Sequence, residues 1–153
     1  MPDQPSLPVT FRPGRTRAVL HTLGAASFVV ITIVALLLGG LSPGEKASFV
    51  FTGALFWGVL WLLARPRIDA DAEGVTVVNV ARSRRLSWAE IVKVNLRPGD
   101  PWVFLDLTDG TSMAAMGIQP GMAKASAIRD AKALRALTET HHSSPRASNT
   151  GEV

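Results

Sequence analysis

Residues 28–38 read FVVITIVALLL, a run in which Thr32 is the single polar side chain and no residue is charged. The uncharged stretch extends in both directions, so that residues 18–44 contain no Asp, Glu, Lys or Arg. A helix rises about 1.5 Å per residue and the hydrocarbon core of a bilayer is about 30 Å thick, so roughly 20 apolar residues span it. We therefore expect a transmembrane helix over about residues 18–41.

A second uncharged run covers residues 47–64 and is bounded by Lys46 and Arg65, whose long side chains can extend to the headgroup level. Between the two runs, residues 42–46 read SPGEK, which favours a tight turn and an antiparallel helical hairpin. A cleaved signal peptide has a shorter apolar core and no second hydrophobic segment. Two core helices of a soluble protein would need more surrounding chain than is present. We expect a membrane hairpin over residues 17–65, with the lipid bilayer as its partner.

Basic residues flank the hairpin on the side of its two ends. They are Arg12, Arg15, Arg17, Arg65 and Arg67. The connecting turn contains only Lys46. Because short loops rich in Lys and Arg stay on the cytoplasmic side, we expect both termini to be cytoplasmic and the chain to cross the inner, or cytoplasmic, membrane twice.

Charge is nearly balanced in the rest of the chain. The net charge is +4, but residues 65–139 contain eleven Lys and Arg against nine Asp and Glu. A nucleic-acid-binding domain carries a basic surface of its own, so we expect no nucleic-acid partner. The absence of cysteine excludes disulfides and thiolate metal sites. His141 and His142 have no partner at ligand spacing, and no nucleophile is accompanied by a histidine, so we expect no metal, cofactor or enzymatic activity.

After the hairpin the pattern changes to short runs that alternate between apolar and polar residues, which is typical of strands. Six strands are expected, over about residues 68–71, 75–80, 85–88, 91–97, 102–107 and 111–116. The residues expected to face the core from the fourth and fifth strands are Val92, Val94, Leu96, Val103, Leu105 and Leu107. From Gly117 onward apolar residues recur every three or four positions, which indicates an amphipathic helix. They are Met122, Ala125, Ile128, Ala131, Leu134 and Leu137.

The predicted strands and the helix that follows them indicate a folded domain over residues 66–139. The flanking residues 1–16 and 140–153 are expected to be disordered tails, the first of them basic, because they contain too few apolar residues to form a core.

Four segments resemble one bacterial family. They are RPR (65–67) followed by ADAEGV (70–75), RRLSWAEI (84–91) and LTDGT (107–111). With the preceding hairpin they are similar to the bacterial pleckstrin-homology (PH) domain family named after low-molecular-weight protein antigen 6. The resemblance covers about residues 65–137 and the hairpin. It implies an α+β fold, in which a PH-like antiparallel β-barrel or sandwich is capped by a C-terminal α-helix, and it implies no reaction.

Two groups of residues are candidates for binding. Arg82, Arg84 and Arg85 form a basic loop, and each such charge near an anionic leaflet contributes about 1 kcal/mol. Contact with anionic lipid and a plain solvated loop both remain open for this set. The first loop between strands, where PH domains hold inositol phosphates with basic residues, is acidic here through Asp69, Asp71 and Glu73. We therefore expect no phosphoinositide recognition by that route.

The second candidate is the outer face of the fifth predicted strand. Trp102 and Phe104 lie opposite the core residues of that strand, and Lys93 and Arg97 are expected to share their face. Exposed aromatic residues beside basic residues can form the energetic centre of an interface, although the C-terminal helix or stacked arginines could instead cover them. The leading hypothesis is a non-enzymatic domain that binds a protein partner or self-associates at the cytoplasmic membrane face. The alternative is an anionic-lipid or small-ligand sensing module.

Overall fold

The computed structural model describes residues 5–143. Their contacts divide the chain into two units. One unit is the helical segment Gly14–Arg65, and the other combines the residues before it with those from Pro66 onward. The second unit is thus assembled from two separate pieces of chain.

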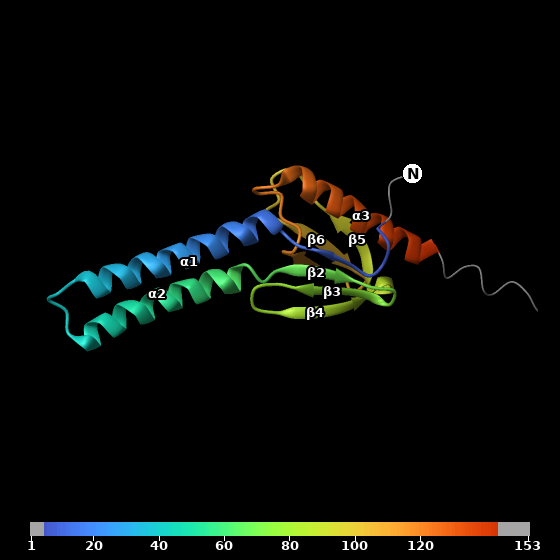
Figure 1. Cartoon of the computed structure of the whole chain (residues 1–153). Helices are drawn as coiled ribbons and strands as arrows, with labels where there is room; N and C mark the ends of the chain where they lie inside the picture. The colour runs from blue at the N-terminus through green and yellow to red at the C-terminus, as the bar shows by residue number, and fades with distance from the viewer. Residues whose placement is uncertain (1–4, 144–153) are drawn as a thin grey trace, which may run out of the picture. The chain divides into compact units, whose positions relative to one another are not determined.

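The helical unit is a hairpin of α1 (Gly14–Leu37) and α2 (Pro43–Leu63), which run side by side (Figure 1). The first turn of α2 is closed by a capping box. In it, the Ser42 hydroxyl accepts a hydrogen bond from the Glu45 N–H, and the Glu45 carboxylate accepts one from the Ser42 N–H. The predicted hairpin is therefore present, and α1 begins four residues before the predicted start at 18.

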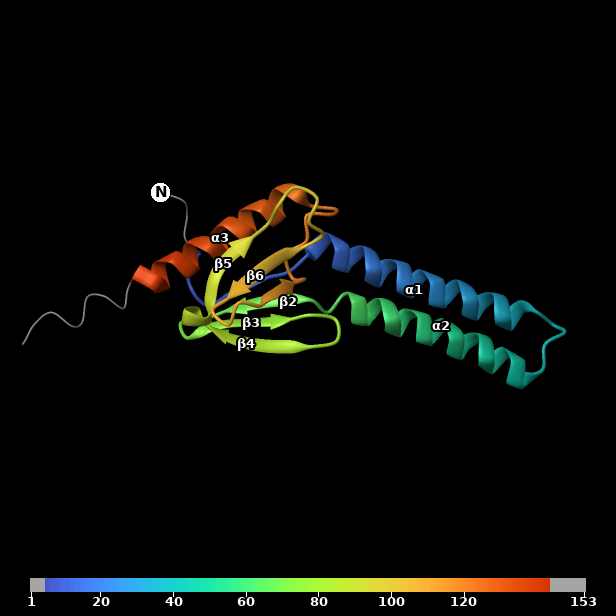
Figure 2. The same ribbon diagram turned by 180° about the vertical axis from the view of Figure 1, so that it is seen from behind.

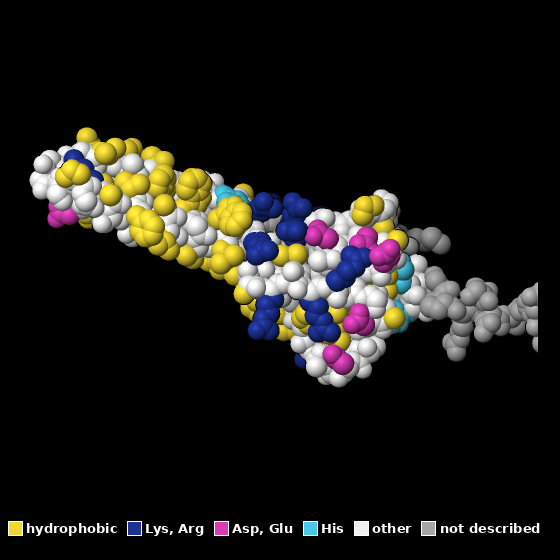
Figure 3. Space-filling view, turned by 90° about the horizontal axis from the view of Figure 1, so that it is seen from below, with side chains coloured by type: hydrophobic (Ala, Val, Ile, Leu, Met, Phe, Trp, Pro, Cys, Tyr) yellow, Lys and Arg dark blue, Asp and Glu magenta, His cyan; other side chains and the backbone are white. Residues whose placement is uncertain are grey.

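Both helices are long and apolar enough to cross a membrane, and only 11% of the most apolar window of each is buried. The core helices of a soluble protein would bury most of such a surface. Hydrophobic side chains instead cover much of the hairpin's visible surface (Figure 3). These two helices suggest membrane association.

The second unit contains two antiparallel sheets (Figure 1). Sheet A has the order β1 (Val9–Phe11), β2 (Arg67–Ala70), β3 (Gly74–Val78) and β4 (Ser83–Ser87). Sheet B has the order β5 (Ile91–Asn95), β6 (Val103–Leu107) and β7 (Ser112–Ala115). A single 3₁₀ turn, η1 (Trp88–Glu90), connects the two sheets, and α3 (Lys124–Ser143) ends the described chain.

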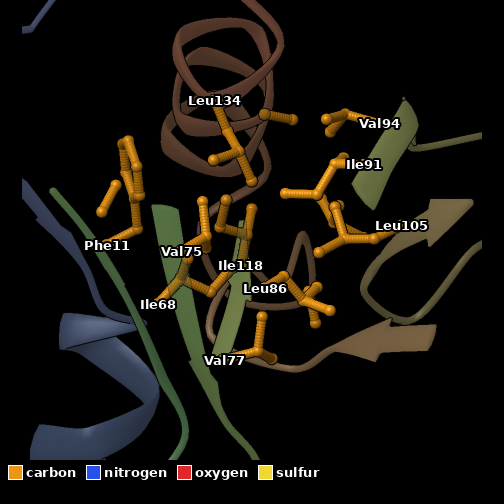
Figure 4. Packing of buried hydrophobic residues seen from close by; sticks show 14 of the residues in the cluster. Phe11, Ile68, Val75, Val77, Leu86, Ile91, Val94, Leu105, Ile118 and Leu134 are labelled. Carbon is orange, nitrogen blue, oxygen red and sulfur yellow. The ribbon is translucent and has the colours of Figure 1, made fainter. Parts of the chain in front are cut away.

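The core lies between the sheets and is closed on one side by α3. Ile68 and Val75 point inward from sheet A, Leu105 points inward from sheet B, and Leu134 of α3 points into the space between them (Figure 4). The predicted α+β class, the antiparallel strands and the C-terminal helix are confirmed. Of the two forms that we expected, the described residues form a two-sheet sandwich and no closed barrel, because the sheets are separate hydrogen-bonded ladders.

β1 corrects the predicted tail over residues 1–16. Val9–Phe11 pairs antiparallel with β2, so that Phe11 lies opposite Ile68, and the Phe11 side chain is only 6% exposed. A three-residue strand is too short to give a periodic signal, and its partner lies beyond the whole helical hairpin. Only the folded chain brings the two segments together.

β5 corrects the predicted alternation. The register shifts between Ile91 and Lys93, which is a β-bulge. An extra residue reverses the inward and outward assignment beyond it, so Ile91 and Val94 are both buried while Val92 is 57% exposed. Val92 is therefore not a core residue. Val103, Leu105 and Leu107 of β6 are buried as expected.

α3 also differs from the prediction at both ends. Its buried stripe is Ala127, Ala131, Leu134, Leu137 and Thr138. Ile128 and Met122, which the sequence analysis assigned to the core face, are exposed. The helix continues to Ser143, so residues 140–143 are helical and not part of a disordered tail. Of the two predicted tails, residues 1–4 and 144–153 lie outside the described part of the chain.

Candidate binding surfaces

The outer face of sheet B carries two aromatic rings next to one another. Because side chains alternate along β6, Phe104 and Asp106 point away from the core that Val103 and Leu105 enter. Trp102 precedes β6, and its ring centroid lies 6.4 Å from that of Phe104, with a tilt of 51°. Both rings are half-buried. Strand alternation predicted that the two rings share one face, and the structure brings them next to one another.

Polar side chains flank these rings at positions fixed by strand register. Asn95 lies opposite Phe104, and Lys93 lies opposite Asp106. The Asn95 amide donates a hydrogen bond to the Asp106 carboxylate. A hollow of about 140 Å³ on this face is lined by Asn95, Arg97, Asp100, Phe104, Asp106 and Ser112. The arrangement offers an aromatic centre, both signs of charge and a shallow concavity.

Trp102 differs from the other tryptophan of the β domain in how its indole is held. The Trp102 Nε1–H is buried and has no hydrogen-bond partner within the described chain. The Nε1–H of Trp88 donates to the Asp71 carbonyl oxygen at 3.0 Å. A buried donor without an acceptor costs free energy. Because its indole makes no hydrogen bond within the described chain, the Trp102 ring is held by packing.

The basic set predicted from the sequence is largely neutralised by carboxylates. The Arg85 guanidinium forms a bidentate pair with Asp71 at 2.9 and 3.0 Å, and it also reaches Glu73 at 3.2 Å. Arg84 lies 4.0 Å from both Glu90 and Asp109. Arg82 is exposed and forms no ion pair with the carboxylates that the structure describes.

These pairs also perturb the acidic partners. The hydrogen bonds from the Arg85 guanidinium, and then the one from the Glu73 N–H, lower the pKa of Asp71. Hydrogen bonds from the Ser87 N–H and hydroxyl lower the pKa of Glu90. The acidic turn after β2 thus binds β4 through Arg85, whose guanidinium is hydrogen-bonded to the carboxylates of Asp71 and Glu73.

The two histidines near the end of α3 are packed against Trp88. The His141 ring stacks on the Trp88 ring with centroids 4.4 Å apart, and His142 Nε2 lies 3.0 Å from the Trp88 carbonyl oxygen. Among residues 5–143, no group of three or more His, Asp and Glu side chains could hold a metal ion. Both histidines therefore have a structural role that links α3 to η1.

A third surface was missed by sequence analysis. It is a groove between the turn after β5 and the start of α3, and Lys124, Ile128 and Lys132 contribute to it. The helical periodicity indicated that Ile128 belongs to the core face, but the buried stripe of α3 begins one position earlier, at Ala127. Ala131, Leu134 and Leu137 are buried as predicted. Ala127 and Ile128 lie four and three residues before Ala131, so both continue this stripe, and the apolar pattern alone could not decide which of the two stays exposed.

Comparison with known proteins places this geometry in a family. A family model described as "Bacterial PH domain" matches residues 65–137. Uncharacterized proteins of Mycobacterium bovis and Mycobacterium tuberculosis are 34% identical to the chain over 106 residues, which are 62% of this chain and 68% of each relative. The chain belongs to the bacterial PH-domain family. The resemblance seen in the sequence is thereby confirmed, whereas no solved structure matches this chain.

The PH domain assignment fits the geometry of the sites. A PH domain is a non-catalytic module, which is consistent with the expected absence of enzymatic activity. The turn between β2 and β3, Asp71–Gly74, is short and acidic, and Arg85 occupies its carboxylates. Phosphoinositide binding at that turn therefore has no support from the side chains around it.

Proposed function

We propose that this chain is a non-enzymatic, membrane-anchored binding module. Its hairpin crosses the cytoplasmic membrane twice, and both termini and the PH domain lie in the cytoplasm. The PH domain docks a protein partner, or a second copy of this chain, through the outer face of sheet B. That face is centred on Trp102 and Phe104 and flanked by Lys93 and Arg97.

The pairing of β1 with β2 supports the two-pass topology. β1 precedes α1 and β2 follows α2, yet Phe11 and Ile68 are neighbours in one sheet. Strands of one sheet must lie on the same side of a membrane, so the chain between them crosses an even number of times. The arginines at the two ends of the hairpin favour the cytoplasm for that side.

The aromatic pair on the outer face of sheet B carries the proposal for docking. α3 contributes its buried residues to the core on the opposite side of sheet B, so it does not cover this face. Large aromatic side chains that are partly desolvated and surrounded by polar groups are enriched at the energetic centres of interfaces. The Trp102–Phe104 pair with Lys93, Asn95 and Asp106 around it has this composition.

Site-specific photo-cross-linking in intact membranes tests the proposal. The photoreactive residue p-benzoylphenylalanine replaces Ser112, which lies opposite Asp106 on the docking face, or Arg82, which is exposed on the β3–β4 connection. We expect one discrete product from position 112 and none from position 82. A product of twice the chain's mass identifies a second copy of this chain, and another mass identifies a different protein.

The product must also depend on the aromatic pair. Trp102→Ala should abolish it, and Lys93→Glu combined with Arg97→Glu should weaken it without disturbing the core. Val92→Ala removes an exposed apolar side chain elsewhere on sheet B and serves as the control. A product that forms equally in the Trp102→Ala chain, or no product from position 112, would overturn the proposal.

For the lipid-sensing alternative, Arg82 is the one residue of the basic loop that forms no ion pair with the carboxylates that the structure describes. Arg84 and Arg85 are engaged by carboxylates, so they offer little free positive charge to a membrane. Lys124 and Lys132 of the PH domain likewise form no ion pair with any carboxylate in the described part of the chain.

A further inference from the structure

Exposed apolar side chains of the PH domain are few and unevenly placed. Outside the helical hairpin, the large hydrophobic residues that are exposed in the described chain are Val92, Met122 and Ile128. Met122 is 57% exposed, and it precedes α3 by two residues. Ile128 lies in the first turns of α3. Two of the three thus gather at one end of one helix.

A groove of about 230 Å³ lies beside Ile128, and its lining includes Pro120 and Lys124, which are each two residues from Met122 in the sequence. It is lined by Leu96, Arg97, Pro98, Gly99, Asp100, Pro120, Lys124, Ile128, Ala131, Lys132 and Arg135. Its floor is apolar, and four of its lining residues are cations, whereas Asp100 is its single carboxylate. The Asp100 carboxylate already accepts a hydrogen bond from the Arg97 N–H at 2.9 Å.

The cations of this groove contrast with those of the basic loop. Lys124 and Lys132 form no ion pair with any carboxylate in the described part of the chain, whereas Arg84 and Arg85 do. Arg135 is exposed, and one of its guanidinium nitrogens donates to the Val94 carbonyl oxygen at 2.8 Å. The two lysines therefore leave an uncompensated positive field over an apolar floor.

The groove also lies at a particular end of the PH domain. Gly117 packs so closely on β2 that a Cβ at this position would lie 2.6 Å from the Arg67 carbonyl carbon. Asn79, at the end of β3, donates to the Ala114 carbonyl oxygen and accepts from the Met116 N–H. These contacts hold the chain that leads into α3 at the edge where β2 begins, as both ribbon views show (Figures 1 and 2).

That edge is where the domain is joined to the helices. Phe11 ends β1 three residues before α1 begins, and Arg67 begins β2 four residues after α2 ends. Because Phe11 and Ile68 are opposite one another, both connections leave from the same end of sheet A. The residues at that end of the domain are therefore within three or four residues of chain from the two helices that a membrane would hold.

We propose that Met122 and the groove around Lys124, Ile128 and Lys132 bind an anionic phospholipid of that membrane. The two lysines bind the headgroup phosphate, while Met122 and Ile128 reach the boundary of the acyl chains. A cationic polar set beside a few apolar side chains is the composition of interfacial membrane contacts. The inference rests on the proposed function only in requiring that the hairpin is inserted.

A single introduced cysteine tests this proposal, because the chain contains no cysteine of its own. Met122→Cys and, as a control of equal 57% exposure, Val92→Cys are labelled with an environment-sensitive fluorophore. The full-length chain is reconstituted into vesicles of phosphatidylcholine, with or without phosphatidylglycerol. We expect the probe at 122 to move to an apolar environment only when phosphatidylglycerol is present, and the probe at 92 to remain in water in both cases.

Charge reversal identifies the residues responsible. Lys124→Glu should lower the population of the apolar probe state by about fivefold or more, given the contribution of each cation near an anionic surface. Arg82→Glu changes the net charge equally and should leave the population unchanged. A probe response that is equal at 122 and 92, or that survives Lys124→Glu, would overturn the lipid site.

Two further outcomes separate this inference from others. Inorganic phosphate added to phosphatidylcholine vesicles should not shift the probe at 122, and a shift would mean that free phosphate is the ligand. Co-flotation of the chain with both kinds of vesicle reports insertion of the hairpin. A chain that floats with neither contradicts the membrane anchor itself, whereas a chain that floats with both but shows no shift contradicts only the lipid site.

Discussion

The helical hairpin and the PH domain use glycine and apolar residues in opposite ways. In the hairpin, large apolar side chains face outward, and Gly24 and Gly53 face the side chains of Trp57 and Phe28. In the domain, apolar side chains face inward, and Gly74 and Gly117 face the backbone of neighbouring segments. The outward-facing side chains of the hairpin suggest membrane association, whereas those of the domain exclude water from its core.

This contrast determines how each unit responds to change. An aromatic side chain can rotate away from an added methyl group, whereas a paired strand cannot move without breaking its ladder. A substitution that disturbs packing should therefore move side chains in the hairpin with little loss of stability, whereas in the domain it should lower the free energy of unfolding.

The largest effect is expected at β1, the piece of the domain that precedes the hairpin. Phe11→Ala removes a ring that is 6% exposed from the core, which should cost about 3–5 kcal/mol of domain stability. Urea titration of the full-length chain in micelles, followed by hydrogen exchange in peptides from β2 and β3, measures it. Val19→Ala, an exposed change in α1, is the control. Equal protection in both variants would show that β1 is not part of the domain.

A smaller loss of domain stability is expected at Gly117, which packs against the backbone of β2. A Cβ at position 117 would lie 2.6 Å from the Arg67 carbonyl carbon, so Gly117→Ala should destabilise the domain by about 1–3 kcal/mol, the range typical of overpacking. The midpoint of the same urea transition reports the change. Gly121→Ala is the matched control, because nothing lies within 4 Å of a Cβ there. Similar midpoints for the two variants would contradict the close packing of Gly117 on β2.

In the hairpin the corresponding change should be milder. Gly24→Ala places a Cβ 2.4 Å from a carbon atom of the Trp57 ring, and the ring can respond by rotating away from Phe28, which it now contacts at a centroid distance of 5.6 Å. We expect a changed tryptophan emission spectrum in micelles with little change in domain stability. Gly58→Ala, which meets no atom within 4 Å, should alter neither property. Loss of domain protection in Gly24→Ala would show that the hairpin transmits packing errors as well.

The smallest effect concerns charge on the surface of the domain. The folded-state pKa of Asp71 lies below its ordinary value of 3.8 because Arg85 donates to its carboxylate. Asp71 therefore contributes stability that is present above the unfolded pKa and is lost as the pH falls through the folded pKa. The pKa values of Glu90 and Asp109 are also lowered, so these two groups likewise stabilise the fold less as the pH falls. Burial raises the pKa of Asp130, so its effect on stability has the opposite dependence on pH.

We expect the urea midpoint to decline below about pH 4, and to decline less steeply in Asp71→Asn than in the parent chain. The exposed substitution Glu139→Gln is the control and should leave the profile parallel to that of the parent. A steeper acid loss in Asp71→Asn would reverse the assigned sign of this ion pair.

Local patterns predicted much of the fold because each rests on a short-range signal. The hairpin follows from two uncharged runs, and the inward face of β6 follows from strict alternation. Alternation gave a wrong prediction for β5, because the bulge between Ile91 and Lys93 adds a residue to the strand and the pattern of apolar residues does not reveal it. For the candidate site, Trp102 and Phe104 were found by alternation, whereas the groove at Lys124 depends on which of two neighbouring residues of α3, Ala127 or Ile128, faces the core.

By itself, the sequence determined that the chain has two apolar helices followed by a small antiparallel β domain with a C-terminal helix. Those features depend on composition and on periods of two and 3.6 residues, which are local. Tertiary structure alone decided that the segment before the hairpin completes the sheet after it. It also decided that Arg84 and Arg85 are neutralised while Lys124 and Lys132 are not. Pairings between distant segments depend on where the folded backbone brings them, and no local pattern records that position.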